Sequence, residues 1–308
     1  MSVSTGSTRS TSKVARLAVS PPGADGPPPA DRPVRAGKPP GRGARLRRLT
    51  ALAASTVLLT SMTVALAPPS TPVTEFPFNG ADVSWPQCPV GTGLPMPSSK
   101  RKFVIFGLTG GYGFTLNPCL ADQVAWAKDR DKYLAAYSFT GAASPAEVIK
   151  YAKSGPYKAE TTRNAFRNSG YAVARTTIDE MTAAELTVPF VWLDIEPSTK
   201  RPWRKSLWKN GAYIDGQIRA YTEAGMKVGF YLSASTYDSI LPKDYAVPEW
   251  RTVGPRPRDV ALEMCTKASV QGGTRMLSQW WNDTKDFDLI CPKQRTWEKL
   301  KIYFAYPS

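Results

Sequence analysis

A ten-residue stretch in the middle of the chain, Val188–Pro197 (VPFVWLDIEP), constrains the fold more than any other. Its first six residues form an unbroken apolar and aromatic run, which is typical of a strand buried on both faces of a parallel sheet. Asp194 and Glu196 follow this run, and the two-residue period of a strand points both side chains to the same side. Pro197 then stops the strand because it has no N–H for a further ladder bond.

This pair of carboxyl groups indicates acid–base chemistry. Two acids held side by side repel each other and lose hydration, so the pKa of one should rise and leave a proton donor beside a carboxylate. In α/β folds, catalytic groups collect at the ends of parallel strands, where this pair is expected. The alternative is that Asp194 caps a turn and Glu196 makes a surface ion pair.

Strand-like and helix-like patterns alternate through most of residues 79–291. The other expected strands begin at Asn79 and cover Phe103–Leu108, Tyr133–Phe139, Lys227–Ser233, a short segment at Trp250, Leu277–Trp281 and Asp286–Ile290. The expected helices cover 118–128, a segment that starts after Ser144 with Glu147 completing a capping box, 158–186 with Gly170 as a candidate break, Gly211–Glu223 and Arg258–Thr266. This alternation predicts an α/β fold with a parallel sheet or barrel.

The first part of the chain differs from this pattern. Residues 1–44 are rich in Ser, Thr, Pro, Gly and Arg, and we expect them to be disordered. In segment 45–67, a basic cluster precedes nineteen uncharged, mostly apolar residues, 49–67, which is typical of a signal peptide or a single transmembrane anchor. Pro68 follows the small-x-small sequence Ala65–Ala67 and disfavours cleavage there. A Pro/Thr linker, 68–78, then leads into a folded domain, 79–308.

Charge and the absence of histidine narrow the function. Residues 68–308 carry thirty Lys and Arg against twenty-three acidic residues, so the domain is modestly basic and suits an anionic partner such as a wall polymer or a membrane surface. No basic stripe interleaved with aromatic residues appears, so we expect no nucleic-acid partner. The chain has no histidine, which excludes Ser–His and Cys–His pairs and His-ligated metals. Carboxyl groups remain the main catalytic candidates.

Four cysteines indicate an oxidising, extracytoplasmic location. None forms a C-x-x-C pair, and four cysteines allow three connectivities. Of these we favour Cys88–Cys119 with Cys265–Cys291, which closes two local loops, each stabilising the fold by roughly 3–4 kcal/mol on the chain-entropy model.

The motifs together resemble glycoside hydrolase family 25, the lysozyme-like N-acetylmuramidases, and more closely an exported, cysteine-bearing branch of glycoside-hydrolase-like domains. The matching stretches are Gly80–Gln87 (GADVSWPQ), Trp192–Glu196 (WLDIE), Val228–Tyr231 (VGFY) and Leu277–Trp280 (LSQW) together with Asp288. They span the whole expected domain in the family's order. The resemblance implies an irregular TIM-type (β/α) barrel whose cleft lies at the C-terminal strand ends.

The resemblance also implies roles for four acids. Glu196 would be the general acid that protonates the glycosidic oxygen, and Asp194 would tune it and help to stabilise the developing positive charge. Asp82 and Asp288 would flank the same cleft. Such a set suits glycoside cleavage, which needs one protonated and one ionised carboxyl group. No cofactor or metal is expected, because Asp283, Asp286 and Asp288 lack EF-hand spacing and fit a solvated turn plus one cleft acid.

Aromatic and amide side chains near the expected strand ends are candidates for sugar binding, because indole and phenol rings stack on sugar faces. The candidates are Trp85, Tyr137, Trp203, Tyr231, Gln279 and Trp280. Three positions depart from the family's pattern: Leu108–Gly111 lacks an acid before glycine, Ser138 stands where histidine is common, and Ile290 stands where asparagine is common.

We therefore expect a monomeric, secreted or membrane-anchored hydrolase that cleaves β-1,4 glycan bonds of peptidoglycan. Residues 49–67 would contact the membrane if they are not cleaved. The alternative is a catalytically weak or inactive barrel that serves as a wall-glycan-binding or envelope module.

Overall fold

The structure, a computed structural model, describes residues 76–199 and 201–306. Residues 75–308 form one compact unit that contains both disulfides and the apolar core. The expected disordered segment 1–44, the hydrophobic segment 45–67 and most of the linker 68–78 lie outside the described residues. Within the part of the chain that is described, no helix is long and apolar enough to cross a membrane.

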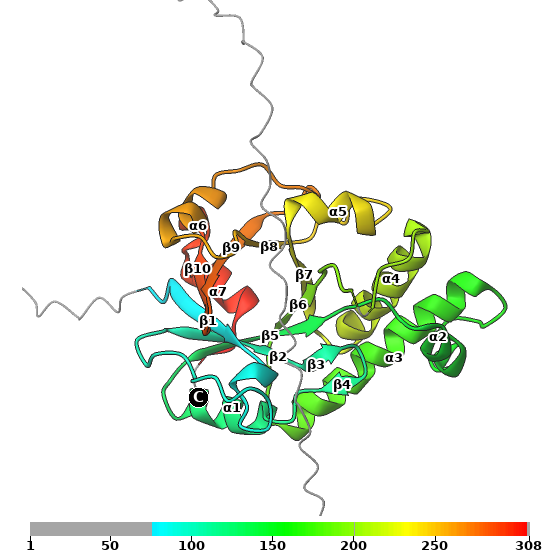
Figure 1. Cartoon of the computed structure of the whole chain (residues 1–308), viewed down its shortest axis with the longest axis horizontal. Helices are drawn as coiled ribbons and strands as arrows, with labels where there is room; N and C mark the ends of the chain where they lie inside the picture. The colour runs from blue at the N-terminus through cyan, green and yellow to red at the C-terminus, as the bar shows by residue number, and fades with distance from the viewer. Residues whose placement is uncertain (1–75, 200, 307–308) are drawn as a thin grey trace, which may run out of the picture. The chain divides into compact units, whose positions relative to one another are not determined.

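Eight strands close into a barrel in the order β1-β10-β9-β8-β7-β6-β5-β2 (Figure 1). All neighbouring strands are parallel except for the two pairs that β10 makes with β9 and β1. The strands are β1 Asn79–Val83, β2 Phe103–Gly107, β5 Tyr133–Phe139, β6 Phe190–Asp194, β7 Lys227–Leu232, β8 Glu249–Thr252, β9 Arg275–Asn282 and β10 Lys285–Ile290. The expected α/β barrel is confirmed, and the reversed strand is what makes it irregular.

Helices surround this barrel, and short elements fill the loops. The helices are α1 Leu120–Lys128, α2 Pro145–Tyr151, α3 Thr162–Ala183, α4 Leu207–Glu223, α5 Ala234–Ile240, α6 Arg258–Met264 and α7 Trp297–Tyr303. A hairpin, β3 Thr109–Tyr112 with β4 Thr115–Leu116, follows β2, and 3-10 turns cover Trp85–Gln87 (η1) and Pro292–Gln294 (η2). The predicted capping box of α2 is present, with Ser144 and Glu147 as its members.

The organising strand β6 is buried on both faces, as its apolar run predicts. Phe190 and Trp192 point into the barrel and join its interior cluster. Val191 and Leu193 point outward and join the cluster beneath the surrounding helices. All four side chains are at most 1% exposed. A strand that packs apolar groups on both sides reads as a continuous hydrophobic run rather than an alternating one.

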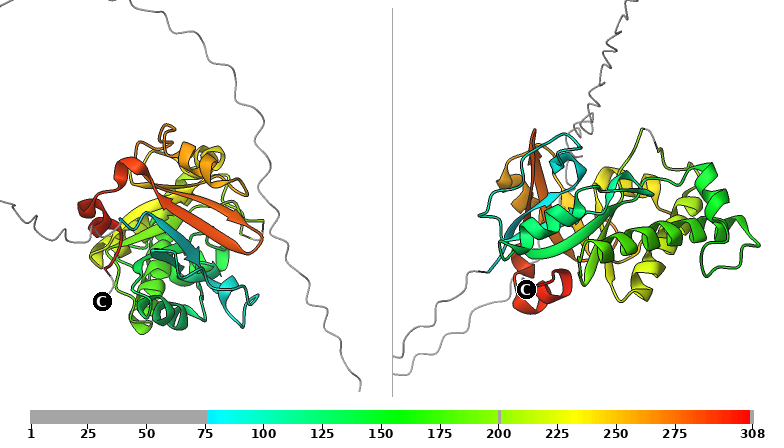
Figure 2. Two further views of the ribbon diagram at one scale, coloured as in Figure 1. Left: turned by 90° about the vertical axis from the view of Figure 1, so that its left-hand side faces the viewer. Right: turned by 90° about the horizontal axis from the view of Figure 1, so that it is seen from below.

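The end of the barrel where the parallel strands begin is closed by α7, the red helix below the strands in the right-hand view of Figure 2. Tyr303 packs on Phe190 and Phe304 packs on Phe103, each with ring centroids 4.8 Å apart. The helices expected from the sequence include none after the last strand, Asp286–Ile290. Since aromatic side chains seal this end, the opposite end, where the parallel strands finish, is the one available for a functional site.

Helices α3 and α4 pack closely together on the side of the barrel away from β9 and β10 (Figures 1 and 2). The suggested break at Gly170 is wrong, because α3 continues from Thr162 to Ala183. A Cβ on Gly170 would lie 1.9 Å from the carbonyl oxygen of Tyr213 on α4. The glycine is therefore required by the close approach of two helix backbones and does not interrupt the helix.

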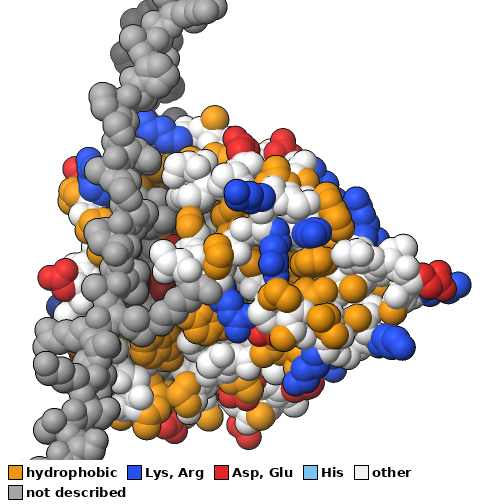
Figure 3. All heavy atoms as spheres, turned by 45° about the vertical axis from the view of Figure 1, so that its right-hand side comes forward, with side chains coloured by type: hydrophobic (Ala, Val, Ile, Leu, Met, Phe, Trp, Pro, Cys, Tyr) orange, Lys and Arg blue, Asp and Glu red, His pale blue; other side chains and the backbone are white. Residues whose placement is uncertain are grey.

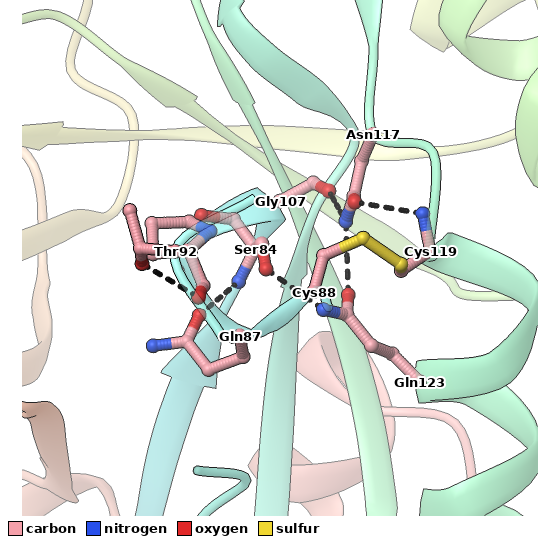
Figure 4. The surroundings of a disulfide bond; sticks show 9 residues. Ser84, Gln87, Cys88, Thr92, Gly107, Asn117, Cys119 and Gln123 are labelled. Atoms are coloured by element: carbon pink, nitrogen blue, oxygen red, sulfur yellow. Dashed lines mark hydrogen bonds between the residues drawn. A yellow bond between two sulfur atoms is a disulfide. The ribbon is translucent and has the colours of Figure 1, made fainter. Parts of the chain in front are cut away.

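Both favoured disulfides, Cys88–Cys119 and Cys265–Cys291, are present. Figure 4 shows that the first joins the loop after β1 to the start of α1. Around it, the Asn117 side-chain amide donates to the Gly107 carbonyl, and Gln123 Nε2 donates to the Ser84 carbonyl at 2.7 Å. This network fixes the ends of β1 and β2 where they reach the open end of the barrel.

Candidate active site

Five carboxyl groups gather at the C-terminal ends of the parallel strands, a region we call the mouth. Asp82 lies near the end of β1, Asp194 is the last residue of β6, and Glu196 follows two residues later. Asp286 and Asp288 lie on β10, whose reversed direction brings its first half to the same end of the barrel. The groups are near enough for the charges of Asp82 and Glu196 to shift the pKa of their neighbours.

The backbone after β6 keeps its strand geometry far enough to place Asp194 and Glu196 side by side. The Ile195 N–H donates to the Tyr231 carbonyl at 2.9 Å, which continues the ladder with β7. The Trp203 indole N–H donates to the Glu196 carbonyl at 2.8 Å and holds the turn that follows. Two successive positions on one side of a strand thus carry the two acids, as the sequence predicts.

A chain of hydrogen bonds crosses the mouth and joins three strands. The Tyr231 hydroxyl donates to Gln279 Oε1 at 2.7 Å, and Gln279 Nε2 donates to Asp82 Oδ2 at 2.8 Å. On the neighbouring strands, the Trp250 indole N–H donates to Asp288 Oδ1 at 2.8 Å. Asp288 Oδ2 has no hydrogen-bond partner among the described residues, so Trp250 alone anchors this carboxyl group.

Burial sets the protonation of the pair on β6. Desolvation raises the pKa of Asp194 well above its usual value, and the charges of Glu196 and Asp82 raise it further. Desolvation also raises the pKa of Glu196, while the polar hydroxyl group of nearby Tyr231 acts in the opposite direction. Asp194 is buried and its Oδ1 has no hydrogen-bond partner among the described residues, whereas Glu196 is partly exposed. The two groups therefore differ in access to solvent.

The remaining acids of the mouth are also held toward their neutral forms. Desolvation, followed by the charge of Asp288, raises the pKa of Asp82 well above its usual value. Desolvation raises the pKa of Asp288 to about 8. The pKa of Asp286 also rises to about 8, through desolvation and the charges of Asp82 and Glu196. Like charges placed together in a dry site resist simultaneous ionisation. Several of these carboxyl groups are therefore expected to stay protonated at a pH at which an exposed carboxyl group is ionised.

Aromatic rings form the floor beneath these acids, with Trp250 at the centre. Its ring packs edge-on against Tyr231 at 4.7 Å, Tyr137 at 5.9 Å and Trp192 at 6.0 Å between centroids. A Cβ on Gly107 would lie 2.8 Å from the Tyr137 hydroxyl oxygen, so the glycine leaves room for that ring. Of the predicted sugar-binding residues, Tyr137, Tyr231 and Gln279 lie in the mouth.

The other predicted sugar-binding residues lie outside the hydrogen-bond chain and the aromatic floor of the mouth. Trp85 is partly exposed in η1, at the end of β1. Trp203 is partly buried, and its indole supports the backbone at Glu196. Trp280 points outward from β9, is 8% exposed and stacks on Phe287 with centroids 5.5 Å apart. Trp280 is thus a packing residue on the outside of the barrel.

Two residues of the mouth did not emerge from the sequence. Asp286 is expected both to start a strand and to belong to a solvated turn; in the structure it lies on β10 and lines a shallow hollow together with Asp82, Gln87 and Lys285. The period-two spacing of Asp286 and Asp288 was the available signal. Trp250 stands between two charged residues, Glu249 and Arg251. Such a segment does not have the apolar run that indicates a buried strand, so nothing in the sequence indicates that Trp250 faces inward. Among the described residues, no group of three or more His, Cys, Asp or Glu side chains is placed to hold a metal ion.

Comparison with known proteins gives similarity in structure alone. No protein-family model matches the sequence, and no curated protein matches it. The virulence factor GHIP, a glycosyl hydrolase 25 of Streptococcus pneumoniae, has a TM-score of 0.50 and 13% identity over 75% of this chain and 94% of its own. A muramidase from Acremonium alcalophilum has a TM-score of 0.49 and 16% identity over 73% of this chain and 97% of its own. A family GH25 lysozyme from Aspergillus fumigatus has a TM-score of 0.49 and 13% identity over 74% of this chain and 99% of its own. The expected resemblance is confirmed for the fold.

Proposed function

We propose that this protein is a peptidoglycan-directed glycoside hydrolase of the muramidase type, which acts outside the cytoplasm on β-1,4 glycan bonds. One observation carries the proposal: Asp194 and Glu196 lie side by side at the end of a central barrel strand, and the pKa of both is raised. The fold match to a glycosyl hydrolase 25 supports the same reaction class. The two disulfides suit an oxidising location.

Glu196 is the proposed general acid, because it is the partly exposed member of the pair. The stronger upward pKa shift falls on Asp194, so in the free protein Asp194 is the group that ionises less readily. The two carboxyls interact, and such a pair titrates as a unit that holds one proton over a wide pH range. A glycan in the mouth would displace water from Glu196 and raise its pKa further, which moves the shared proton to the group that touches the substrate.

The other acids fit the second requirement of glycoside cleavage, a carboxylate that faces the developing positive charge. Asp82 and Asp288 are buried and Asp286 is partly buried, and the three lie close enough together for their charges to raise one another's pKa. The ionised form of one of these carboxyl groups would stabilise the positive charge that develops on the sugar ring. Tyr137, Tyr231 and Gln279 would contact the sugar, since they line the same mouth.

The test is release of reducing sugar from purified peptidoglycan by the oxidised protein and by its Glu196→Gln variant. Loss of a general acid typically lowers the rate by about 10²–10⁴-fold, and we expect a loss in that range. Glu298→Gln is the matched control, because Glu298 is exposed on α7 at the opposite end of the barrel. A variant that keeps the parent's rate would remove Glu196 from the reaction.

A wall-binding module without activity is the second candidate. The hollow lined by Asp82, Gln87 and Asp286 has no space for a molecule of the size of water. A glycan would therefore lie over its rim, which favours a binding role. Sedimentation with peptidoglycan by both the parent and Glu196→Gln, with no sugar released by either, would support this candidate over the hydrolase.

A further inference from the structure

The positive charge of the folded domain is concentrated in two segments of the sequence. Residues 145–169 and 198–210 carry ten Lys and Arg and only two acidic residues. All other residues of 68–308 carry twenty basic and twenty-one acidic residues, a nearly neutral balance. The net positive charge of the domain therefore resides in these two segments. We call the surface formed by their described residues the basic face.

The two segments lie against each other in the fold. The Arg201 guanidinium pairs with Glu147 at 2.6 Å, and the Arg204 guanidinium donates to the Ala143 carbonyl at 2.7 Å. Phe166 and Trp208 pack edge-on, with centroids 6.3 Å apart. Figure 3 shows Lys and Arg side chains spread among apolar ones over the part of the molecule that contains α2, α3 and α4. Cations that are separate in sequence thus share one surface.

Several cations of this face are positioned by aromatic rings. The Arg163 guanidinium lies 5.3 Å from the Trp208 ring centroid, and the Lys209 ammonium lies 5.6 Å from the same ring. No ion pair with an acidic side chain holds Arg163, Lys205 or Lys209 within the described part of the chain. A cation held over a ring keeps its charge available and loses less side-chain freedom when it binds an anion.

We propose that the basic face binds a linear, phosphate-bearing polymer, a second binding site distinct from the mouth. Charge complementarity over two segments suits an elongated polyanion. A lipid surface fits less well, because among described residues Ile149 is the one strongly exposed large apolar side chain on this face. The loop from Glu196 leads directly into the face, and Trp203 in that loop contacts the Glu196 backbone. A polymer bound here lies beside the mouth, where a glycan that carries the polymer would enter.

The experiment measures binding of inorganic polyphosphate to the full chain by calorimetry at several salt concentrations. The face variant is Arg163→Glu, Lys205→Glu and Lys209→Glu together. The control variant, Lys227→Glu, Lys293→Glu and Lys301→Glu, makes the same charge change on exposed residues at the α7 end of the barrel. Each cation that neutralises a phosphate adds about one unit to the slope of log K against log salt. We expect the face variant to lose at least about tenfold in affinity and about three units of slope, and the control to keep both.

The basic segment 1–67 is a second source of attraction, so the measurement is repeated with the chain from residue 70, which retains the compact unit 75–308. Equal losses in the two variants would mean that only net charge matters and would overturn the proposal. Absence of polyphosphate binding by the parent, or binding of anionic lipid vesicles alone, would also overturn it. Hydrolysis of peptidoglycan stripped of phosphate polymers should not change in the face variant, so this outcome is separate from that of the proposed glycosidase.

Discussion

The mouth and the basic face lie at the same end of the barrel, and each brings side chains of like charge together. They limit the repulsion between those charges in opposite ways. The mouth holds acids: Asp82 is 7% exposed, Asp194 is 6% exposed and Asp288 is fully buried. Burial raises their pKa values, so these like charges are tolerated because they are largely neutral. The basic face holds Lys and Arg side chains in contact with water, where like charges are tolerated because solvent screens them.

The two regions differ in how strongly their functional side chains depend on the folded barrel. In the mouth, Asp82 and Asp288 each accept a hydrogen bond from a side chain on another strand, so their chemistry depends on the assembled barrel. On the basic face, Arg163 and Lys209 lie over the Trp208 ring, and no ion pair with an acidic side chain holds either of them within the described part of the chain. We therefore expect substitutions in the mouth to change stability and function together, and substitutions on the basic face to change binding alone.

The largest effect is expected from breaking the hydrogen-bond chain of the mouth with Gln279→Leu. The Gln279 amide accepts from Tyr231 and donates to Asp82, and both partners are buried. Each partner left unpaired costs about 1–3 kcal/mol, so the free energy of unfolding should fall by a few kcal/mol. Urea unfolding measures the loss, and hydrolysis of peptidoglycan should fall with it.

Gln217→Leu is the matched control for this prediction. Gln217 is also fully buried, on α4, but neither atom of its amide has a hydrogen-bond partner among the described residues. Replacing an unpaired buried amide by an apolar group of similar size should be neutral or stabilising. Equal destabilisation by both substitutions would show that the size and shape of the side chain explain the loss, and not the hydrogen bonds that cross the mouth.

The next effect is a dependence of stability on pH that the mouth alone should produce. Burial raises the pKa of Asp288 from an ordinary value of 3.8 to about 8, so the folded state holds a proton that the unfolded state releases. Stability is then greatest below about pH 4 for this group and is lost as the pH rises to about 8, at up to about 1.4 kcal/mol per pH unit. Asp288→Asn keeps an acceptor for Trp250 and should flatten the slope.

Thermal unfolding between pH 5 and pH 9 measures this slope. Each kcal/mol corresponds to about 2–4 °C in the melting temperature for a domain of this size. The parent should melt at a lower temperature at pH 9 than at pH 5, and the difference should shrink in Asp288→Asn. A melting temperature that rises with pH in the parent would contradict the inference that acids of the mouth are protonated in the folded protein.

The parts of this architecture that depend on local sequence were predictable. The apolar run of β6 and the two acids after it follow from strand periodicity, and the cysteine pairs follow from the shortness of the loops that they close. The capping box of α2 is likewise a short-range pattern. The strand and the capping box need information from only a few neighbouring residues, and the disulfides join cysteines 31 and 26 residues apart, each to its nearest partner in sequence.

The features that depend on distant partners were not predictable. Asp286 faces the other acids because β10 runs backward between β9 and β1, a pairing that no short pattern specifies. Gly170 resembles a helix break in sequence but serves a close contact with Tyr213. In both cases the role of the residue depends on which element lies opposite, and that is decided by tertiary packing. Trp280 differs from these, because strand alternation alone places it on the face of β9 opposite to Gln279.

The smallest effect is expected from Lys205→Glu, a single charge reversal on the basic face. Lys205 is exposed and makes no ion pair within the described ranges, so its replacement leaves no buried group without a partner. The free energy of unfolding should change by less than about 0.5 kcal/mol in urea, while affinity for polyphosphate at low salt should still fall. A loss of stability near that of Gln279→Leu would mean that the face is tied to the barrel's folding as tightly as the mouth, and the contrast between the two regions would not hold.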